Sequence, residues 1–156
     1  MQLYEHLKLK TNVKRINGSM DVAPVFRAIL DGESELDRDK EHFWIVCLNT
    51  KNDILRVELV TLGLLDQTLV HPREIFRPAI GCGAKSIILA HHHPSGDPTP
   101  SDKDETLTGR LIEFGKLLDI PVLDHVVIGE GESYWSMREQ FNNYDFHRPT
   151  LADCGW

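Results

Sequence analysis

The chain has 156 residues, the size of a single domain, and its hydrophobic fraction of 41% and charged fraction of 26% are ordinary for a globular protein. These values exclude a fibrous class and wholesale disorder, and no apolar run approaches the roughly 18 residues that span a bilayer. The formal net charge of −7 argues against a nonspecific nucleic-acid binder, which needs clustered Lys and Arg.

The termini and the cysteines indicate the compartment. The N-terminus lacks the pattern of a secretory signal. The three cysteines, Cys47, Cys82 and Cys154, show no CxxC spacing, so we expect reduced thiols and a cytoplasmic protein. We expect a basic, solvated N-terminal arm over residues 1–20, one domain over residues 21–140 and a tail over residues 141–156. The basic residues of the arm are Lys8, Lys10, Lys14 and Arg15.

The first half of the domain predicts one helix and two strands. Asp21 is expected to cap a helix over residues 22–30, with Pro24 in its first turn, and the polar stretch 31–41 ends it. The β-forming segments 42–49 and 54–65 flank the turn-like TKND, so we expect an antiparallel pair of central strands in one sheet.

The second half alternates helices with buried strands. His71 and Pro72 open a second helix over residues 72–83, whose apolar residues form one stripe, and KSIILAHHH is a strand covered on both faces. After the loop PSGDPTP, Ser101 caps a helix through about residue 118. PVLDHVVIG is another buried strand and SYWSM a short last one. The sequence therefore predicts an α+β sandwich, with helices flanking a mixed, mainly antiparallel sheet.

Three residues around the loop form a candidate metal site. Side chains two apart on a strand share a face, so His91 and His93 lie together while His92 points away. Asp104 lies in the first turn of the next helix, where the chain has doubled back and the helix N-terminus favours an ionised carboxylate. Two imidazoles and one carboxylate suit Zn²⁺ and leave an open position for a nucleophilic water. Three histidines in a row also fit a strand that simply ends at the surface.

A resemblance supports the metal interpretation. The segment HHHPSGDPTPSDKD resembles the JAMM motif of JAB/MPN-domain metalloproteases, and with LVHPREIFRPAI, IPVLDHVVIG and YWSM it resembles the RadC-like branch, over roughly residues 20–138. The resemblance implies a JAB/MPN (cytidine deaminase-like) architecture and one zinc per chain on His91, His93 and Asp104. It implies that Ser101 donates a hydrogen bond to the developing oxyanion, although helix capping competes for that hydroxyl.

The resemblance also implies a glutamate at the start of the first strand as general base and proton shuttle, which matches Glu41. Glu74, in a helix first turn, is the rival, and capping or helix-dipole interactions explain it better. Asp124 and His125 are either partners of the metal ligands or, as we favour, a satisfied structural pair.

This sequence departs from the family pattern in two places. RadC-like proteins usually have Asn where this chain has His92, so ligation by His92 is an alternative that strand alternation disfavours. Full-length members carry an N-terminal helix-hairpin-helix module for which this chain has no room, which weakens a DNA-repair inference. We therefore expect a zinc hydrolase acting on a protein or peptide, with neither membrane nor nucleic acid as a partner. The alternatives are a non-catalytic MPN-type interaction module and a DNA-repair accessory or nuclease.

Overall fold

Five strands form one sheet in the order β2-β1-β3-β4-β5. The computed structural model describes residues 11–63 and 70–141. Strands β3 and β4 are parallel, and the other three neighbouring pairs are antiparallel. The strands are β1 (His42–Leu48), β2 (Ile54–Leu62), β3 (Ser86–His92), β4 (Val122–Ile128) and β5 (Tyr134–Ser136).

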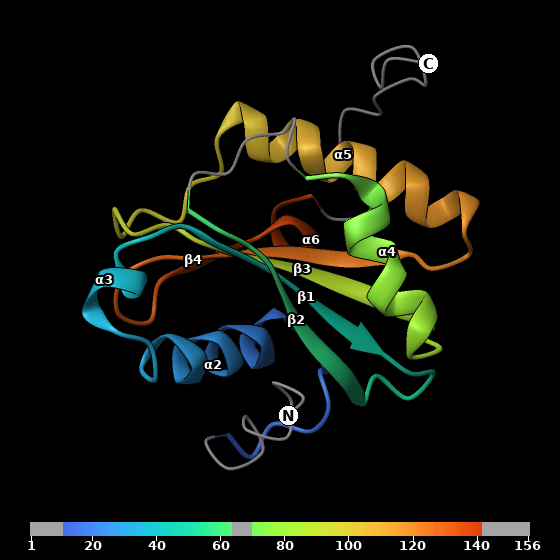
Figure 1. Cartoon of the computed structure of the whole chain (residues 1–156), viewed down its shortest axis with the longest axis horizontal. Coiled ribbons are helices and arrows are strands. Elements are labelled where there is room, and N and C mark those ends of the chain that lie inside the picture. The colour runs from blue at the N-terminus through green and yellow to red at the C-terminus, as the bar shows by residue number, and fades with distance from the viewer. Residues whose placement is uncertain (1–10, 64–69, 142–156) are drawn as a thin grey trace.

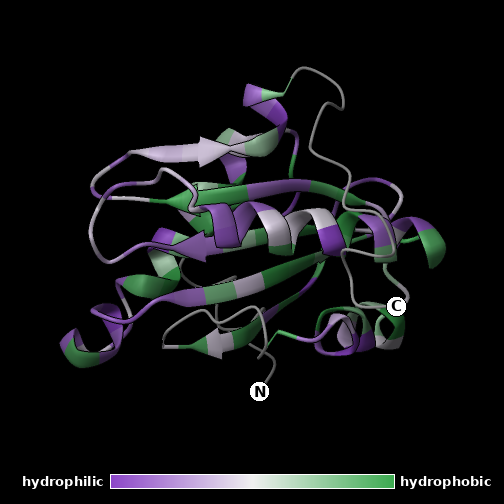
Figure 2. Cartoon of the chain, turned by 90° about the horizontal axis from the view of Figure 1, so that it is seen from above, coloured by the Kyte–Doolittle hydropathy of each residue, from purple (hydrophilic) through white to green (hydrophobic). Residues whose placement is uncertain are grey.

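Helices cover both faces of the sheet, with α2 on one side and α4 and α5 on the other (Figure 1). Each main helix carries both hydrophilic and hydrophobic residues (Figure 2), as elements with one face against a sheet do. The helices are α2 (Ser19–Leu30), α3 (Glu35–Arg38), α4 (Pro72–Gly81), α5 (Asp102–Leu117) and α6 (Met137–Gln140). The expected α+β sandwich with a mixed, mainly antiparallel sheet is confirmed.

Side chains along the central strands point alternately to the two faces of the sheet, so the apolar core has two parts. Strands β1 and β3 are buried along their whole length, so each supplies one apolar set to each helical layer. Trp44, Val46 and Ile88 pack in the cluster that contains the buried residues of α2. Phe43, Ile45 and Leu89 pack in the cluster that contains those of α4 and α5. Odd-numbered residues of β3 therefore face α4 and α5, and even-numbered residues face α2.

The structure corrects the expected start of the first helix. Helix α2 begins at Ser19, so Asp21 is not its cap, and Pro24 lies inside the helix rather than in its first turn. The Asp21 carboxylate instead accepts the backbone N–H of Asn17 at 2.8 Å, and Gly18 occupies the N-cap position without a side-chain bond. A carboxylate in the first turn is still favoured there by the helix dipole.

Two short helices and one strand position also differ from expectation. The stretch 31–41 contains α3, capped by Ser34, and α6 follows directly after β5. A helix of four residues is too short to show the periodicity that identifies helices. Strand β2 lies at the edge of the sheet, not at its centre, because it pairs with β1 alone, and most of its residues are only partly buried.

The structure contains the other predicted elements: the hairpin of β1 and β2, helix α4, strand β3 and helix α5. In the described part, residues 11–63 and 70–141, none of the helices combines the length and apolar character needed to cross a bilayer. Cys47 and Cys82 are free thiols. The expected arm up to residue 10, the strand end at residues 64–65, and the tail from residue 142 with Cys154 lie outside the described residues.

Candidate metal centre

His91 lies one residue before the end of β3, on the face that packs against α4 and α5. Its side chain is 1% exposed, and neither ring nitrogen makes a hydrogen bond. Phe43 on the neighbouring strand β1 is its partner in register, and their ring centroids are 5.9 Å apart. Buried polar atoms without hydrogen-bond partners are rare and call for an explanation, and coordination of a metal ion would satisfy the ring nitrogens.

His93 follows the strand and is held by its own backbone. Its N–H donates to the carbonyl of Ile128 at 3.0 Å, which continues the alignment of the chain beside β4. Its Nδ1 lies 2.9 Å from the carbonyl oxygen of Asp97. Because a carbonyl can only accept, this contact places the hydrogen on Nδ1 and leaves the Nε2 lone pair free for a metal.

Asp104 is fixed by the cap of α5. Ser101 is the N-cap residue, and it forms a capping box with Asp104 at position N3. The Asp104 Oδ2 accepts both the backbone N–H and the hydroxyl of Ser101, each at 2.8 Å. The Ser101 oxygen in turn accepts the Asp104 backbone N–H at 3.2 Å. The hydroxyl of Ser101 therefore serves the cap and the carboxylate in this structure.

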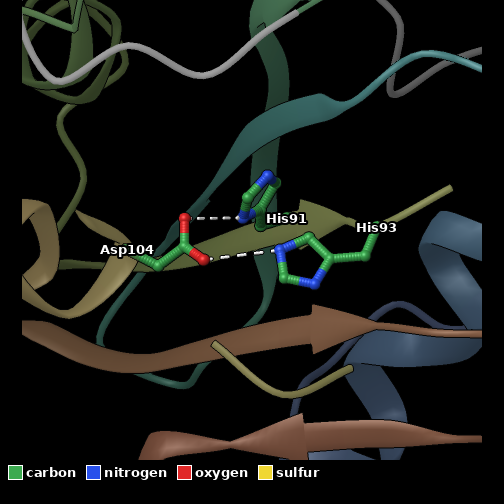
Figure 3. Close-up of side chains that lie close together, drawn as sticks. All are labelled: His91, His93 and Asp104. Atoms are coloured by element: carbon green, nitrogen blue, oxygen red, sulfur yellow. Dashed lines mark ion pairs between the residues drawn. The ribbon is translucent and has the colours of Figure 1, made fainter. Parts of the chain in front are cut away.

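The two imidazoles and the carboxylate converge on one point (Figure 3). Asp104 Oδ1 lies 3.3 Å from His91 Nδ1, and Asp104 Oδ2 lies 3.4 Å from His93 Nε2. One candidate ligand atom from each of the three residues lies within 4.8 Å of the others. The strand end and the first turn of α5 thus bring together the three side chains that the sequence analysis singled out.

The electrostatics of the triad favour a bound cation. Burial alone would raise the pKa of Asp104, but its contacts with His91, His93 and the Ser101 N–H lower it far below its ordinary value. Burial alone would lower the pKa of His91, but the Asp104 and Glu41 carboxylates raise it above its ordinary value. The surroundings therefore favour a positive charge at this point, whether a proton or a metal ion carries it.

The donor set fits a transition metal. The unpartnered nitrogens of His91, the free Nε2 of His93 and the ionised Asp104 are the donors that Zn²⁺ and neighbouring first-row metals prefer. Calcium and magnesium prefer shells made of oxygen alone. His91, His93 and Asp104 can therefore hold one metal ion.

Glu41 lies beside this triad, at the residue before β1. Its Oε2 is 3.8 Å from His91 Nε2, and its side chain is 33% exposed. Glu41 and Ser101 line a surface cleft of about 390 Å³ together with two of the triad residues, and Pro94, Ser95 and Lys103 complete the lining. A carboxylate at this position can reach both the triad and a molecule in the cleft.

Glu74, the rival base, lies elsewhere. It lines a different groove with Arg56 and Glu58, and its carboxylate is 3.7 Å from Arg73 and 3.8 Å from Arg77. These contacts and its place in the first turn of α4 account for it as a surface charge.

The neighbouring histidines and Asp124 take other partners. His92 points to the α2 side, and its Nδ1 lies 3.4 Å from the Lys40 carbonyl oxygen, so it takes no part in the triad. The expected pairing of Asp124 with His125 is wrong, because adjacent strand residues point to opposite faces. Asp124 accepts from the Ser136 hydroxyl at 2.8 Å.

His125 lies beside the triad, and its contact with Thr108 is not predicted from the sequence. Its Nδ1 lies 2.6 Å from the hydroxyl of Thr108, which also donates to the Asp104 carbonyl at 2.6 Å, and its ring stacks 6.3 Å from that of His91. Burial lowers the pKa of His125 to about 3, so the ring is neutral. The apolar character of the β4 sequence indicates a buried strand, but only the packing of α5 on β4 reveals the partner of His125.

A family model and several curated relatives match this chain. A family model described as "RadC-like JAB domain" matches residues 16–143. A UPF0758 protein of Caldanaerobacter subterraneus subsp. tengcongensis is 53% identical over 107 residues, which cover 69% of this chain and 45% of that protein. One of Alkaliphilus oremlandii is 45% identical over 133 residues, covering 85% of this chain and 55% of that protein. The chain spans about half the length of these curated relatives, whose names state no activity.

Proposed function

This chain belongs to the RadC-like JAB-domain family, and on that premise we propose that it is a zinc-dependent hydrolase of the JAMM metallopeptidase type. The observation that carries the proposal is the convergence of His91, His93 and Asp104 within 4.8 Å, with Glu41 3.8 Å from His91. When bound by these three residues, Zn²⁺ would supply Lewis acidity, which polarises a carbonyl and lowers the pKa of water to about 7.

Glu41 moves the protons in this proposal. Its carboxylate takes a proton from the attacking water as the new C–O bond forms, and it delivers that proton to the leaving nitrogen as the C–N bond breaks. The site suits this task because the side chain is one third exposed and opens onto the cleft, within reach of substrate and solvent.

Ser101 steadies the charge on the carbonyl oxygen. Its hydroxyl now donates to Asp104 Oδ2 at 2.8 Å, and turning toward a substrate oxygen costs that one hydrogen bond. The backbone N–H of Ser101, also 2.8 Å from Asp104 Oδ2, keeps the carboxylate oriented meanwhile. The hydroxyl can therefore move without releasing the ligand.

We propose a protein or peptide substrate with an amide or isopeptide bond, since the resemblance to JAMM proteins supports this class. The acidic balance of the chain, with a net charge of −7, speaks against a nucleic-acid substrate. We also propose a cytoplasmic setting, because Cys47 and Cys82 are free thiols.

Metal content and hydrolysis test the proposal together. Protein purified without chelators or a polyhistidine tag should contain about one zinc per chain, and His91→Ala should contain almost none. A panel of peptides and isopeptide-linked peptides, analysed by mass spectrometry, should show cleavage that depends on this zinc. Glu41→Gln should keep the metal and lose at least about a hundredfold in rate.

Glu74→Gln is the matched control, because it makes the same change at the other candidate glutamate, outside the cleft. It should leave both metal content and rate unchanged. Absence of zinc from the unmodified protein would refute the proposal. Bound zinc with a biological effect that survives Glu41→Gln would favour an interaction module, and salt-dependent gel shifts with DNA would favour a nuclease or repair accessory.

A further inference from the structure

Two histidines on the other face of the sheet from the metal triad point at one backbone carbonyl. His42 Nδ1 lies 2.9 Å from the carbonyl oxygen of Lys40, and His92 Nδ1 lies 3.4 Å from the same oxygen. The two histidines are partners in register across β1 and β3, and their ring centroids are 5.8 Å apart. The mechanism described above uses neither ring.

Both rings act as hydrogen-bond donors to this carbonyl. A carbonyl oxygen only accepts, so each Nδ1 must carry the hydrogen, and its two lone pairs allow it to accept both. His42 is 1% exposed and His92 is 9% exposed. Both contacts are therefore shielded from competing water.

The stronger of the two donors is anchored in the apolar core. The ring of His42 stacks on Trp44 with centroids 4.8 Å apart and an angle of 17° between the planes. Trp44 in turn lies 4.7 Å from Phe26 of α2, again between ring centroids. Trp44 and Phe26 are fully buried, so the imidazole of His42 has little freedom to move.

The carbonyl that they hold belongs to the peptide group directly before Glu41. The carbonyl of Glu41 itself accepts the backbone N–H of Gly63 at 2.9 Å, so the peptide groups on both sides of this residue are fixed. The Glu41 side chain then extends to the triad side, 3.8 Å from His91. We propose that His42 and His92 are positioning residues that hold the Glu41 carboxylate at the metal centre. This inference rests on the proposed function, in which Glu41 moves the protons.

Amide hydrogen exchange of the metal-free protein measures how firmly the backbone around Glu41 is fixed. Replacing His92 by Leu removes one donor to the Lys40 carbonyl, and the Gly63 N–H should then exchange about tenfold faster. His92→Asn should restore slow exchange, because an amide NH₂ group can donate to the same oxygen. The Gly96 N–H, which donates to the His93 carbonyl at 3.0 Å, serves as a reference amide that should not change.

A second readout reports the effect at the metal site. The visible spectrum of the Co²⁺-loaded protein should change with pH, and Glu41→Gln should shift the midpoint of that change. His42→Leu and His92→Leu should shift the midpoint in the same direction while Co²⁺ affinity stays within about threefold of the unmodified protein, and the Asn variants should reverse the shift. His71→Leu, the same substitution at an exposed position, should change nothing.

The outcomes separate this inference from the proposed function. If the unmodified protein takes up no Co²⁺ or Zn²⁺, the proposed function fails and the inference falls with it. If metal binds and Glu41→Gln moves the midpoint, but the Leu variants leave both the midpoint and the Gly63 exchange unchanged, the inference alone is overturned. It is also overturned if His92→Leu loses Co²⁺ affinity as severely as His91→Ala, since His92 would then act on the metal ligands and not on Glu41.

Discussion

The single hydroxyl of Ser101 has two roles that can be separated by substitution. It accepts the Asp104 N–H as the cap of α5, and it donates to the Asp104 carboxylate from which it would turn to a substrate. Replacement of a serine cap by alanine costs about 1 kcal/mol of stability, whereas glycine costs only a few tenths, because glycine leaves the N-cap backbone free to adopt its conformation and be solvated.

Ser101→Ala and Ser101→Gly should therefore differ in stability and agree in activity. We expect urea unfolding to place the alanine variant about 1 kcal/mol below the glycine variant. Both lack the hydroxyl, so both should lose about 100-fold or more in kcat on a peptide that the unmodified protein cleaves. If the loss of kcat followed stability instead, with glycine close to the unmodified protein, the hydroxyl would act only as a cap.

His125 should impose a pH dependence on folding. Its pKa is about 3 in the folded protein because of burial, against about 6.5 in an unfolded chain. Between these values the unfolded chain binds a proton that the folded protein excludes. The stability associated with the neutral ring is therefore complete above about pH 6.5 and is lost as the pH falls toward 3.

His125→Asn removes this titration and keeps a donor for Thr108. Between pH 6 and pH 4, the unfolding free energy of the metal-free, unmodified protein should fall by about 1 kcal/mol per pH unit more than that of the variant. The raised pKa of His91 acts in the opposite direction in both proteins, so the difference between the two pH curves reports the titration of His125 and its coupling to His91. Parallel pH curves from urea titrations of the two proteins would show that His125 is protonated in the folded state.

At the scale of elements, the turn between β4 and β5 supports the loop that carries His93. The Glu130 N–H donates to the Gly96 carbonyl at 2.9 Å, and the Gly96 N–H donates to the His93 carbonyl at 3.0 Å. Gly129 is in close contact with this loop: a Cβ added there would lie 2.4 Å from the Gly96 carbonyl oxygen and 2.9 Å from Pro98 Cδ. The first of these neighbours is backbone, so the loop itself would have to move.

Gly129→Ala should therefore weaken metal binding as well as folding. We expect a loss of about 1–3 kcal/mol in unfolding free energy, as for other overpacked sites, and at least tenfold weaker Zn²⁺ binding in competition with a chromophoric chelator. Gly81→Ala is the matched control, since a Cβ there meets nothing within 4 Å at the end of α4. Unchanged Zn²⁺ affinity in Gly129→Ala would mean that the loop yields without displacing His93.

The sequence predicts those elements whose pattern is local. Strands β1 and β3 are apolar over their whole length, and Ser101 with the residues that follow it marks the start of α5, so both could be found from the sequence. The edge position of β2 could not, because it depends on which strands pair. The four-residue helices α3 and α6 show too little pattern to be detected.

The candidate site also combines residues that local patterns predict with residues that only strand pairing brings together. The alternation of side chains along the strand and the start of the next helix are enough to group His91, His93 and Asp104. Glu41 came from the resemblance alone, because its closeness to His91 is created by the antiparallel register in which Phe43 opposes His91. The contacts of His42 and His92 with the Lys40 carbonyl arise from that register too, and no local pattern indicates them.

At the scale of the whole molecule, the triad joins two layers of the fold, the sheet and the helices that cover one of its faces. His91 lies near the end of the central strand β3, which contributes to both apolar clusters, and Asp104 lies in the first turn of α5, which covers one face of the sheet. A metal ion held by both residues binds only when β3, the loop and α5 are all in place. Its binding free energy is then added to the stability of the entire domain.

Zinc should therefore raise the melting temperature of the whole domain in one transition. At a free Zn²⁺ concentration of 100 times Kd the gain is about 2.7 kcal/mol, which for a domain of this size corresponds to roughly 5–10 °C by calorimetry. A chelator should reverse the shift, and His91→Ala should abolish it. Glu74→Gln, on a separate groove, should keep the full shift. An equal shift in His91→Ala would mean that zinc stabilises the protein at some other place, and the metal centre described here would not be the one that binds it.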